Sequence, residues 1–238
     1  MTEGSDSARA DTMVLASASP RRRRLLGWLG LPFTATVVDT PEDLNTPLSS
    51  DPEALAISLA EEKARAARAD GHGPNALVLC FDTIVVLDGA LLGKPRDLPD
   101  AWRMLRALSG RVHQVVTGAA LLCPGEAGAC TFAVTTRVQM KPLTDSAIEV
   151  WMAQGEFMGC AGAYNIEGQI AEVGLDECYQ NVAGLPLCHL FAALSGALEA
   201  GGVKCASPCM VGEPTSPVRV CDAALGQRCV LGPKVTAS

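Results

Sequence analysis

Residues 76–92, ALVLCFDTIVVLDGALL, decide the fold class of this chain. The first six residues form a continuous apolar run, which is typical of a strand that is covered on both faces of a sheet. We expect this run to end at Asp82 and Thr83. The remainder predicts a hairpin, because two short apolar runs flank the turn-forming pair Asp88 and Gly89. A hairpin beside a buried strand implies that the sheet is not purely parallel.

Helical patterns alternate with further strand patterns on both sides of this stretch. The helices are predicted from N-cap and proline signals that precede apolar residues spaced three and four apart, at 20–30, 51–69, 98–108, 144–155 and from 186 through Leu198. Further strands are predicted at 13–16, 112–123 and 131–140. This interleaving indicates an α/β fold with a mixed central sheet flanked by helices.

The 238 residues divide into three parts. Residues 1–12 are small and polar, and we expect a flexible N-terminus. Residues 13–200 carry the periodic patterns and fit one domain of ordinary size. Residues 201–238 are rich in Gly, Pro, Ser and Cys without periodicity, which predicts a poorly ordered tail.

The composition excludes several classes of function. A net charge of −7 and ten aromatic residues argue against a nucleic-acid binder, which usually has a basic face or a stacking platform. No run approaches the roughly 18–20 apolar residues that span a bilayer, so no membrane partner is expected. Residues 1–11 are acidic and lack the apolar core of a signal peptide. We therefore expect a cytoplasmic enzyme or small-molecule binder with reduced cysteines.

Familiar nucleotide and metal motifs are missing from the sequence. It contains neither the GxxxxGK[ST] phosphate loop nor the GxGxxG fingerprint, and its three histidines are scattered. A four-cysteine zinc site is conceivable in the tail, from Cys205, Cys209, Cys221 and Cys229. Their spacing fits no common zinc ribbon, so chance cysteines are the favoured interpretation.

A candidate anion site lies where the first strand enters the first helix, at residues 17–22. A capped helix start leaves N–H donors free, and its dipole favours an anion. Arg21 and Arg22 add charged donors that match phosphate oxygens. The alternative is a solvated basic helix start, and we interpret Arg23 and Arg24 as surface charge.

A second candidate is the pair Asp82 and Thr83. A carboxylate at the end of a buried strand is costly unless it has a role, and ligands gather outside the carboxyl ends of strands. The alternative is an aspartate that caps the following turn. Lys94 follows the hairpin and could close over this site, and Lys63 lies on the buried row of its helix. Taken singly, each lysine could equally be a surface residue.

In this order, seven segments resemble the Maf family of nucleotide pyrophosphatases, also called septum-formation-inhibitor-like proteins. They are LASASPRR (15–22), AEEKAR (60–65), CFDTIVVLDG (80–89), GKPRD (93–97), LSGRVHQVVTG (108–118), AGAYNIEG (161–168) and NVAGLPL (181–187). The resemblance implies a fold with a central cleft, akin to the inosine-triphosphate pyrophosphatases. It also implies hydrolysis of a nucleoside triphosphate to the monophosphate and pyrophosphate, a divalent cation (Mg²⁺ or Mn²⁺) and a homodimer.

The resemblance also implies roles for particular residues. It places the catalytic acid on Asp82, further catalytic positions on Glu42, Lys63 and Lys94, and phosphate-binding positions on Ser17, Arg21 and Arg22. Asp82 and Glu42 would hold the metal. The chemistry agrees, because carboxylates bind Mg²⁺ and cationic side chains neutralise charge as pyrophosphate leaves.

The base that is recognised stays open at this point. Arg21 and Thr83 match the family's pyrimidine branch, whereas Glu167 stands where that branch has Gln and resembles the 7-methyl-GTP branch. We expect UTP, dTTP or CTP as substrate, with a 7-methyl-GTP-type substrate as the alternative. A non-catalytic nucleotide-binding regulator of cell division is the rival from another class.

Overall fold

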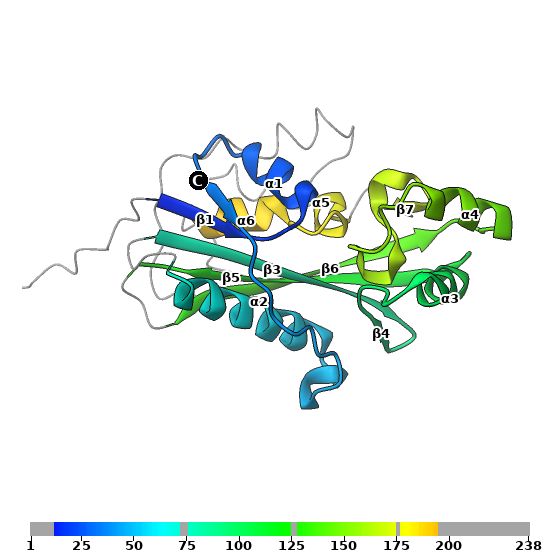
Figure 1. Cartoon of the computed structure of the whole chain (residues 1–238), viewed down its shortest axis with the longest axis horizontal. Helices are drawn as coiled ribbons and strands as arrows, with labels where there is room; N and C mark the ends of the chain where they lie inside the picture. The colour runs from blue at the N-terminus through cyan, green and yellow to red at the C-terminus, as the bar shows by residue number, and fades with distance from the viewer. Residues whose placement is uncertain (1–11, 72–75, 125–127, 175–176, 195–238) are drawn as a thin grey trace, which may run out of the picture.

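The computed structural model describes residues 12–71, 76–124, 128–174 and 177–194. In this part a seven-stranded sheet carries helices on both faces (Figure 1). The strands are β1 (Thr12–Ala16), β2 (Thr34–Thr36), β3 (Ala76–Leu87), β4 (Ala90–Leu92), β5 (Val112–Leu122), β6 (Ala129–Met140) and β7 (Ala171–Val173). The helices are α1 (Pro20–Gly27), α2 (Pro52–Ala69), α3 (Leu98–Leu108), α4 (Asp145–Ala153), α5 (Tyr179–Val182) and α6 (Leu187–Leu194).

The sheet is mixed, as the hairpin predicts. Its order is β2-β1-β3-β5-β6-β7, and β4 pairs with β3 beside this path. β1 runs parallel to β2 and β3, whereas the pairs β3–β4, β3–β5, β5–β6 and β6–β7 are antiparallel. The α/β class is confirmed.

Local signals in the sequence place most element ends correctly. The Ser19 side chain caps α1 by accepting from the N–H of Arg22 at 3.4 Å, and Asp51 caps α2 in the same way. Asp88 and Gly89 have φ of 51° and 82°, as a two-residue hairpin turn requires. The predicted helix 144–155 is α4, with Thr144 as its N-cap.

β3 does not end at Asp82, and this prediction was wrong. The strand continues through Asp82 and Thr83 to Leu87, because β5 pairs with it from Val78 to Val86. Asp82 therefore neither ends a strand nor caps a turn. The polar pair interrupts the apolar run without interrupting the backbone ladder.

The opposite edge of β3 has a gap in its pairing. β1 pairs with residues 76–79 and β4 with residues 85–87. On that side, no strand of the described part of the chain pairs with the backbone between them, residues 80–84. Side chains from both faces of the sheet can therefore reach one opening at this edge.

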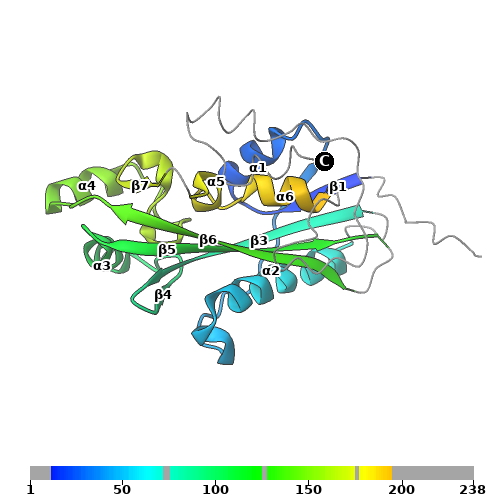
Figure 2. The same ribbon diagram turned by 180° about the vertical axis from the view of Figure 1, so that it is seen from behind.

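The two faces of the sheet carry different helices. α2 covers one face, and α1, α5 and α6 cover the other, as both ribbon views show (Figures 1 and 2). α2 lies so close to β5 that a Cβ on Gly118 would come within 2.2 Å of the Ala56 carbonyl carbon. Glycine at this position sets the distance between α2 and the sheet.

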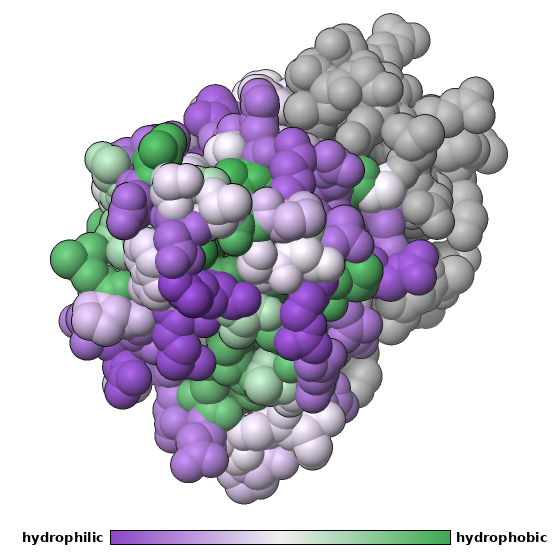
Figure 3. Space-filling model, turned by 90° about the vertical axis from the view of Figure 1, so that its right-hand side faces the viewer, coloured by the Kyte–Doolittle hydropathy of each residue, from purple (hydrophilic) through white to green (hydrophobic). Residues whose placement is uncertain are grey.

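The end of the molecule near α3 and α4 presents a mixed surface. Figure 3 shows apolar areas that are divided by hydrophilic side chains on this face. Exposed apolar side chains in the described part of the chain include Leu98, Val112 and Val150. No helix among the described residues is long and apolar enough to cross a bilayer.

The described residues bear only partly on the three expected parts of the chain. β1 begins at Thr12, one residue before the expected domain start. The expectations for residues 1–11, for the end of the last helix at Leu198 and for the tail 201–238 lie outside the described residues.

Candidate active site

A cavity of about 840 Å³ opens at the gap in the β3 edge. It is within the size range of small-molecule sites, roughly 300–1,000 Å³. The candidate residues from the sequence all line it: Ser17, Arg21, Arg22, Glu42, Lys63, Asp82, Thr83, Lys94 and Glu167. They come from the loop after β1, α1, the loop after β2, α2, β3, the loop after β4 and the segment before β7, so the fold brings together residues up to 150 positions apart.

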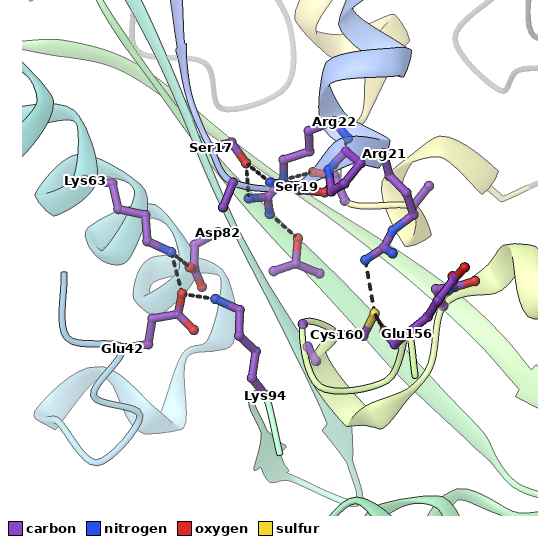
Figure 4. Close-up of a pocket in the computed structure, with 18 of the residues that line it drawn as sticks. Ser17, Ser19, Arg21, Arg22, Glu42, Lys63, Asp82, Lys94, Glu156 and Cys160 are labelled. Atoms are coloured by element: carbon purple, nitrogen blue, oxygen red, sulfur yellow. Dashed lines mark hydrogen bonds and ion pairs between the residues drawn. The ribbon is translucent and has the colours of Figure 1, made fainter. Parts of the chain in front are cut away.

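Two carboxylates meet one lysine on the α2 side of the cavity. The Lys63 Nζ donates to Glu42 Oε1 at 2.8 Å and also donates to Asp82 Oδ1. Lys94 Nζ reaches the same Glu42 oxygen from the other side (Figure 4). Lys63 and Asp82 are only 9% and 4% exposed. The prediction that Lys63 points to the buried side is confirmed.

The environments of these two carboxylates push their pKa values in opposite directions. Burial raises the pKa of Asp82 and outweighs the attraction of Lys63. Burial acts on Glu42 as well, but the charges and hydrogen bonds of Lys63 and Lys94 outweigh it and lower the pKa of Glu42. Glu42 is therefore the carboxylate that is held ionised, and Asp82 is the one better suited to take up a proton.

A divalent cation fits the donors of this corner in one way only. Glu42 and Asp82 direct oxygens toward one point, where the Lys63 ammonium now contacts both. Within the described residues no group of three or more His, Cys, Asp or Glu side chains could hold a metal. Mg²⁺ commonly takes one or two carboxylates together with substrate phosphates. The residues fit a cation that is bound jointly with a phosphorylated ligand.

Arg22 projects from the first turn of α1 into the opposite side of the cavity. Its Nε donates to the Gly184 carbonyl at 2.7 Å, and its Nη2 donates to Thr83 Oγ1 at 2.9 Å. A longer contact of 3.5 Å joins its Nη1 to Ser17 Oγ. Burial lowers the pKa of Arg22, although Asp82 opposes this shift. An arginine keeps its charge in proteins, so a half-buried cation faces the cavity.

Arg21 and Arg24 leave α1 in another direction, toward the segment 156–168. Arg21 Nη2 lies 3.1 Å from Cys160 Sγ, on the side of the cavity that Glu156 also lines (Figure 4). Arg24 forms an ion pair with Glu167, and both side chains are about half exposed. Arg24 is exposed, as the interpretation of it as surface charge expects, but it also lines the cavity and pairs with Glu167 there.

Sequence reasoning missed several residues of this site. Cys160 and Asn165 line the cavity, and Asn165 donates to Glu156 Oε2 at 2.8 Å. Gly184 has φ of 94° and approaches Arg22 closely. Two of the seven family-like segments contain Asn165 and Gly184, so the signal was present without a role attached to it.

Comparisons with known proteins agree with this geometry. A family model described as "Maf-like protein" matches residues 12–197. A protein of Geobacter metallireducens named "dTTP/UTP pyrophosphatase" is 43% identical over 183 residues, which cover 75% of this chain and 92% of the relative. Proteins with the same name from Chlorobium luteolum and Bacillus velezensis are each 41% identical, covering 78% and 76% of this chain and 97% and 94% of the relatives.

Proposed function

This chain belongs to the Maf-like protein family, and from that premise we propose that it is a nucleoside triphosphate pyrophosphatase. It hydrolyses a nucleoside triphosphate to the nucleoside monophosphate and pyrophosphate. The observation that carries the proposal is the arrangement of Lys63 between Glu42 and Asp82, opposite the half-buried Arg22 across one cavity. This arrangement places a proton acceptor and fixed positive charge around one space.

The cationic residues bind the triphosphate and neutralise charge in the transition state. A triphosphate carries about four negative charges, and Arg22, Lys63 and Lys94 present donors to the cavity from two sides. Water forms a bond to the α phosphorus, and the bond from that atom to the oxygen that bridges it to the β phosphorus breaks, which leaves charge on the pyrophosphate. Fixed cations stabilise that developing charge without reorganisation of solvent.

Asp82 is the proposed general base. Its raised pKa brings proton uptake closer to neutral pH, as efficient proton transfer from water requires. Glu42 remains ionised and holds the two lysines through its Oε1 atom. Glu42 thereby fixes Lys63 against Asp82 and Lys94 at the cavity edge.

Glu42 and Asp82 are also the proposed ligands of a divalent cation. When bound, Mg²⁺ or Mn²⁺ would supply charge neutralisation on the phosphate oxygens. Lys63 would then move its charge from the carboxylates toward the substrate. The full set of donors would be completed by the triphosphate, because the described residues offer two carboxylates at this corner.

We infer a pyrimidine triphosphate, dTTP or UTP, as the substrate class. The matched relatives carry these two nucleotides in their names. The base is proposed to lie on the side of Arg24 and Glu167, away from the lysine cluster. Arg24 neutralises the Glu167 carboxylate, which would otherwise oppose the O4 acceptor of uracil or thymine.

Turnover of a panel of triphosphates tests the substrate class. Initial rates with dTTP, UTP, CTP, GTP, 7-methyl-GTP and ATP, each with Mg²⁺, should be highest for dTTP and UTP. A preference for 7-methyl-GTP would favour the other branch. Tight binding without turnover of any of the six would favour the regulatory alternative and contradict the proposed hydrolase.

A further inference from the structure

Two residues outside the cavity's lining stand behind Arg22. Thr117 of β5 lies directly opposite Thr83 of β3 in the ladder, and it is fully buried. Asn181 of α5 is also fully buried. Neither residue is among the candidate site residues, yet both join the hydrogen bonds that hold the Arg22 guanidinium.

The protons along these hydrogen bonds can run in one direction only. Arg22 Nη2 donates to Thr83 Oγ1, and an arginine cannot accept a hydrogen bond in return. Thr117 Oγ1 donates its single proton to the Asn181 backbone carbonyl at 3.2 Å. The 3.0 Å contact between the two threonine hydroxyls must therefore have Thr83 as donor and Thr117 as acceptor.

The hydrogen bond of Arg22 to Gly184 is also connected to the Asn181 carbonyl. Arg22 Nε donates to the Gly184 carbonyl, and the Gly184 N–H donates to the Asn181 carbonyl at 2.9 Å. Hydrogen bonds thus form a closed circuit through Arg22, Thr83, Thr117, Asn181 and Gly184. Two nitrogens of one guanidinium, Nε and Nη2, are thereby linked to a single peptide oxygen.

That peptide oxygen is itself anchored to the sheet. The Asn181 side-chain amide donates to the carbonyls of Val115 at 3.0 Å and Val134 at 2.9 Å. One of these two N–H groups is shared with Thr136 Oγ1, which lies 3.1 Å from the same nitrogen. α5 is therefore tied to both β5 and β6, and the circuit inherits the rigidity of the central sheet. Buried hydrogen-bonded chains of this kind polarise one another and specify one arrangement.

We infer that Thr117 is a positioning residue, which fixes the guanidinium of Arg22 for a polyphosphate through the hydroxyl of Thr83. Thr117 accepts the hydrogen bond of the Thr83 hydroxyl. The Thr83 proton is thereby directed away from Arg22, and the Thr83 oxygen is left to accept from Arg22. Arg22 Nη1, which the circuit does not use, lies 3.5 Å from Ser17 Oγ, and both residues line the cavity. The polyphosphate in this inference rests on the proposed function.

Affinity for inorganic tripolyphosphate, measured by titration calorimetry on the full chain, tests this inference without turnover. Thr117→Val keeps the shape of the side chain and removes its hydroxyl, so binding should weaken roughly tenfold, about the net worth of one hydrogen bond. Thr117→Ser keeps the hydroxyl and should bind within about twofold of wild type. If the valine variant does not fold, Thr117→Ala removes the same hydroxyl with less bulk.

The double variant with Arg22→Met separates positioning from a general structural effect. If Thr117 acts through Arg22, Thr117→Val should cost nothing further once Arg22 is Met. An equal loss in both backgrounds, an unchanged affinity of Thr117→Val, or a serine variant as weak as the valine variant would each overturn the inference. A wild type that binds tripolyphosphate but hydrolyses no nucleotide would contradict the proposed function and leave this test intact.

Discussion

Asp82 and Thr83 are neighbours in β3 and point to opposite faces of the sheet. Asp82 contacts Lys63 of α2, whereas Thr83 accepts a hydrogen bond from Arg22 of α1. Alternation along a strand produces this divergence, and the gap in the β3 edge lets both side chains border one cavity. One dipeptide thereby joins the acidic side and the arginine side of the site.

Replacing Asp82 by Asn should lower kcat by roughly a hundredfold or more, which is typical for the loss of a general base. The amide keeps the shape but cannot accept the proton from water. Steady-state kinetics with UTP measure the effect, and circular dichroism checks the fold. The matched control is Asp88→Asn in the β3–β4 turn, which lies outside the cavity lining and should keep wild-type kcat. Near-normal turnover of folded Asp82→Asn would remove Asp82 from the mechanism.

The two carboxylates that contact Lys63 should change the stability of the fold with opposite signs as pH varies. The pKa of Asp82 in the folded state is raised above the ordinary 3.8. Ionisation of Asp82 therefore destabilises the fold as pH rises through this folded-state pKa. Without added metal, the melting temperature of Asp82→Asn relative to wild type should therefore rise between pH 4 and pH 8.

Glu42 should behave in the reverse way. Its pKa is lowered below 4.5, so it stabilises the fold above that pH and loses this contribution as pH falls through the folded-state value. Glu42→Gln should melt below wild type at pH 7, by a few degrees if the loss is about 1 kcal/mol. The deficit should shrink toward pH 3. If the melting temperatures of the two variants, relative to wild type, changed with pH in the same direction, the opposite pKa shifts of Asp82 and Glu42 would be refuted.

The sequence predicts much of this fold because local signals and burial agree. Some elements have ends that depend on nearby residues, and the sequence locates these ends. The signals are proline at helix starts, the N-caps Ser19 and Asp51, and the turn at Asp88 and Gly89. The predicted end of the buried strand was wrong, because an aspartate in an apolar run suggests a strand boundary when the ion-pair partner of the aspartate is unknown. That partner, Lys63, lies 19 residues away and becomes visible only in the folded chain.

The candidate site also contains residues that the sequence predicts and residues that it does not. The nine candidate residues were found from helix-cap and burial arguments together with the family resemblance, and the structure gathers all of them. The role of Arg24 could not be predicted, since its contact with Glu167 joins α1 to a segment 143 residues later. The circuit behind Arg22 was missed because Thr117 and Asn181 carry no charge that marks them in a sequence.

Gly118→Ala should destabilise the protein and disturb the site together. The added Cβ would meet the Ala56 backbone at 2.2–2.3 Å, and overpacking of this kind costs typically about 1–3 kcal/mol. We expect a fall in melting temperature of about 5 °C, with reduced kcat because α2 carries Lys63. Gly27→Ala has open space around its Cβ and should melt at or above the wild-type temperature. An unchanged melting temperature for Gly118→Ala would contradict the close approach of α2 and β5.

The Arg24–Glu167 pair should control the choice of base. Glu167→Gln supplies a donor as well as an acceptor to uracil, so the ratio of kcat/KM for UTP over GTP should rise several-fold. Arg24→Met leaves the carboxylate without its counter-ion and should move the same ratio downward. Ratios that stay constant in both variants would show that this pair does not contact the base.

The products formed from UTP test the central claim most directly. Full-length protein with Mg²⁺ and UTP should yield UMP and pyrophosphate in equal amounts, as measured by ion-exchange chromatography, and Asp82→Asn should yield roughly a hundredfold less of both in the same time. UDP with inorganic phosphate as the products, or UTP that is bound and recovered intact from the wild type, would contradict the account.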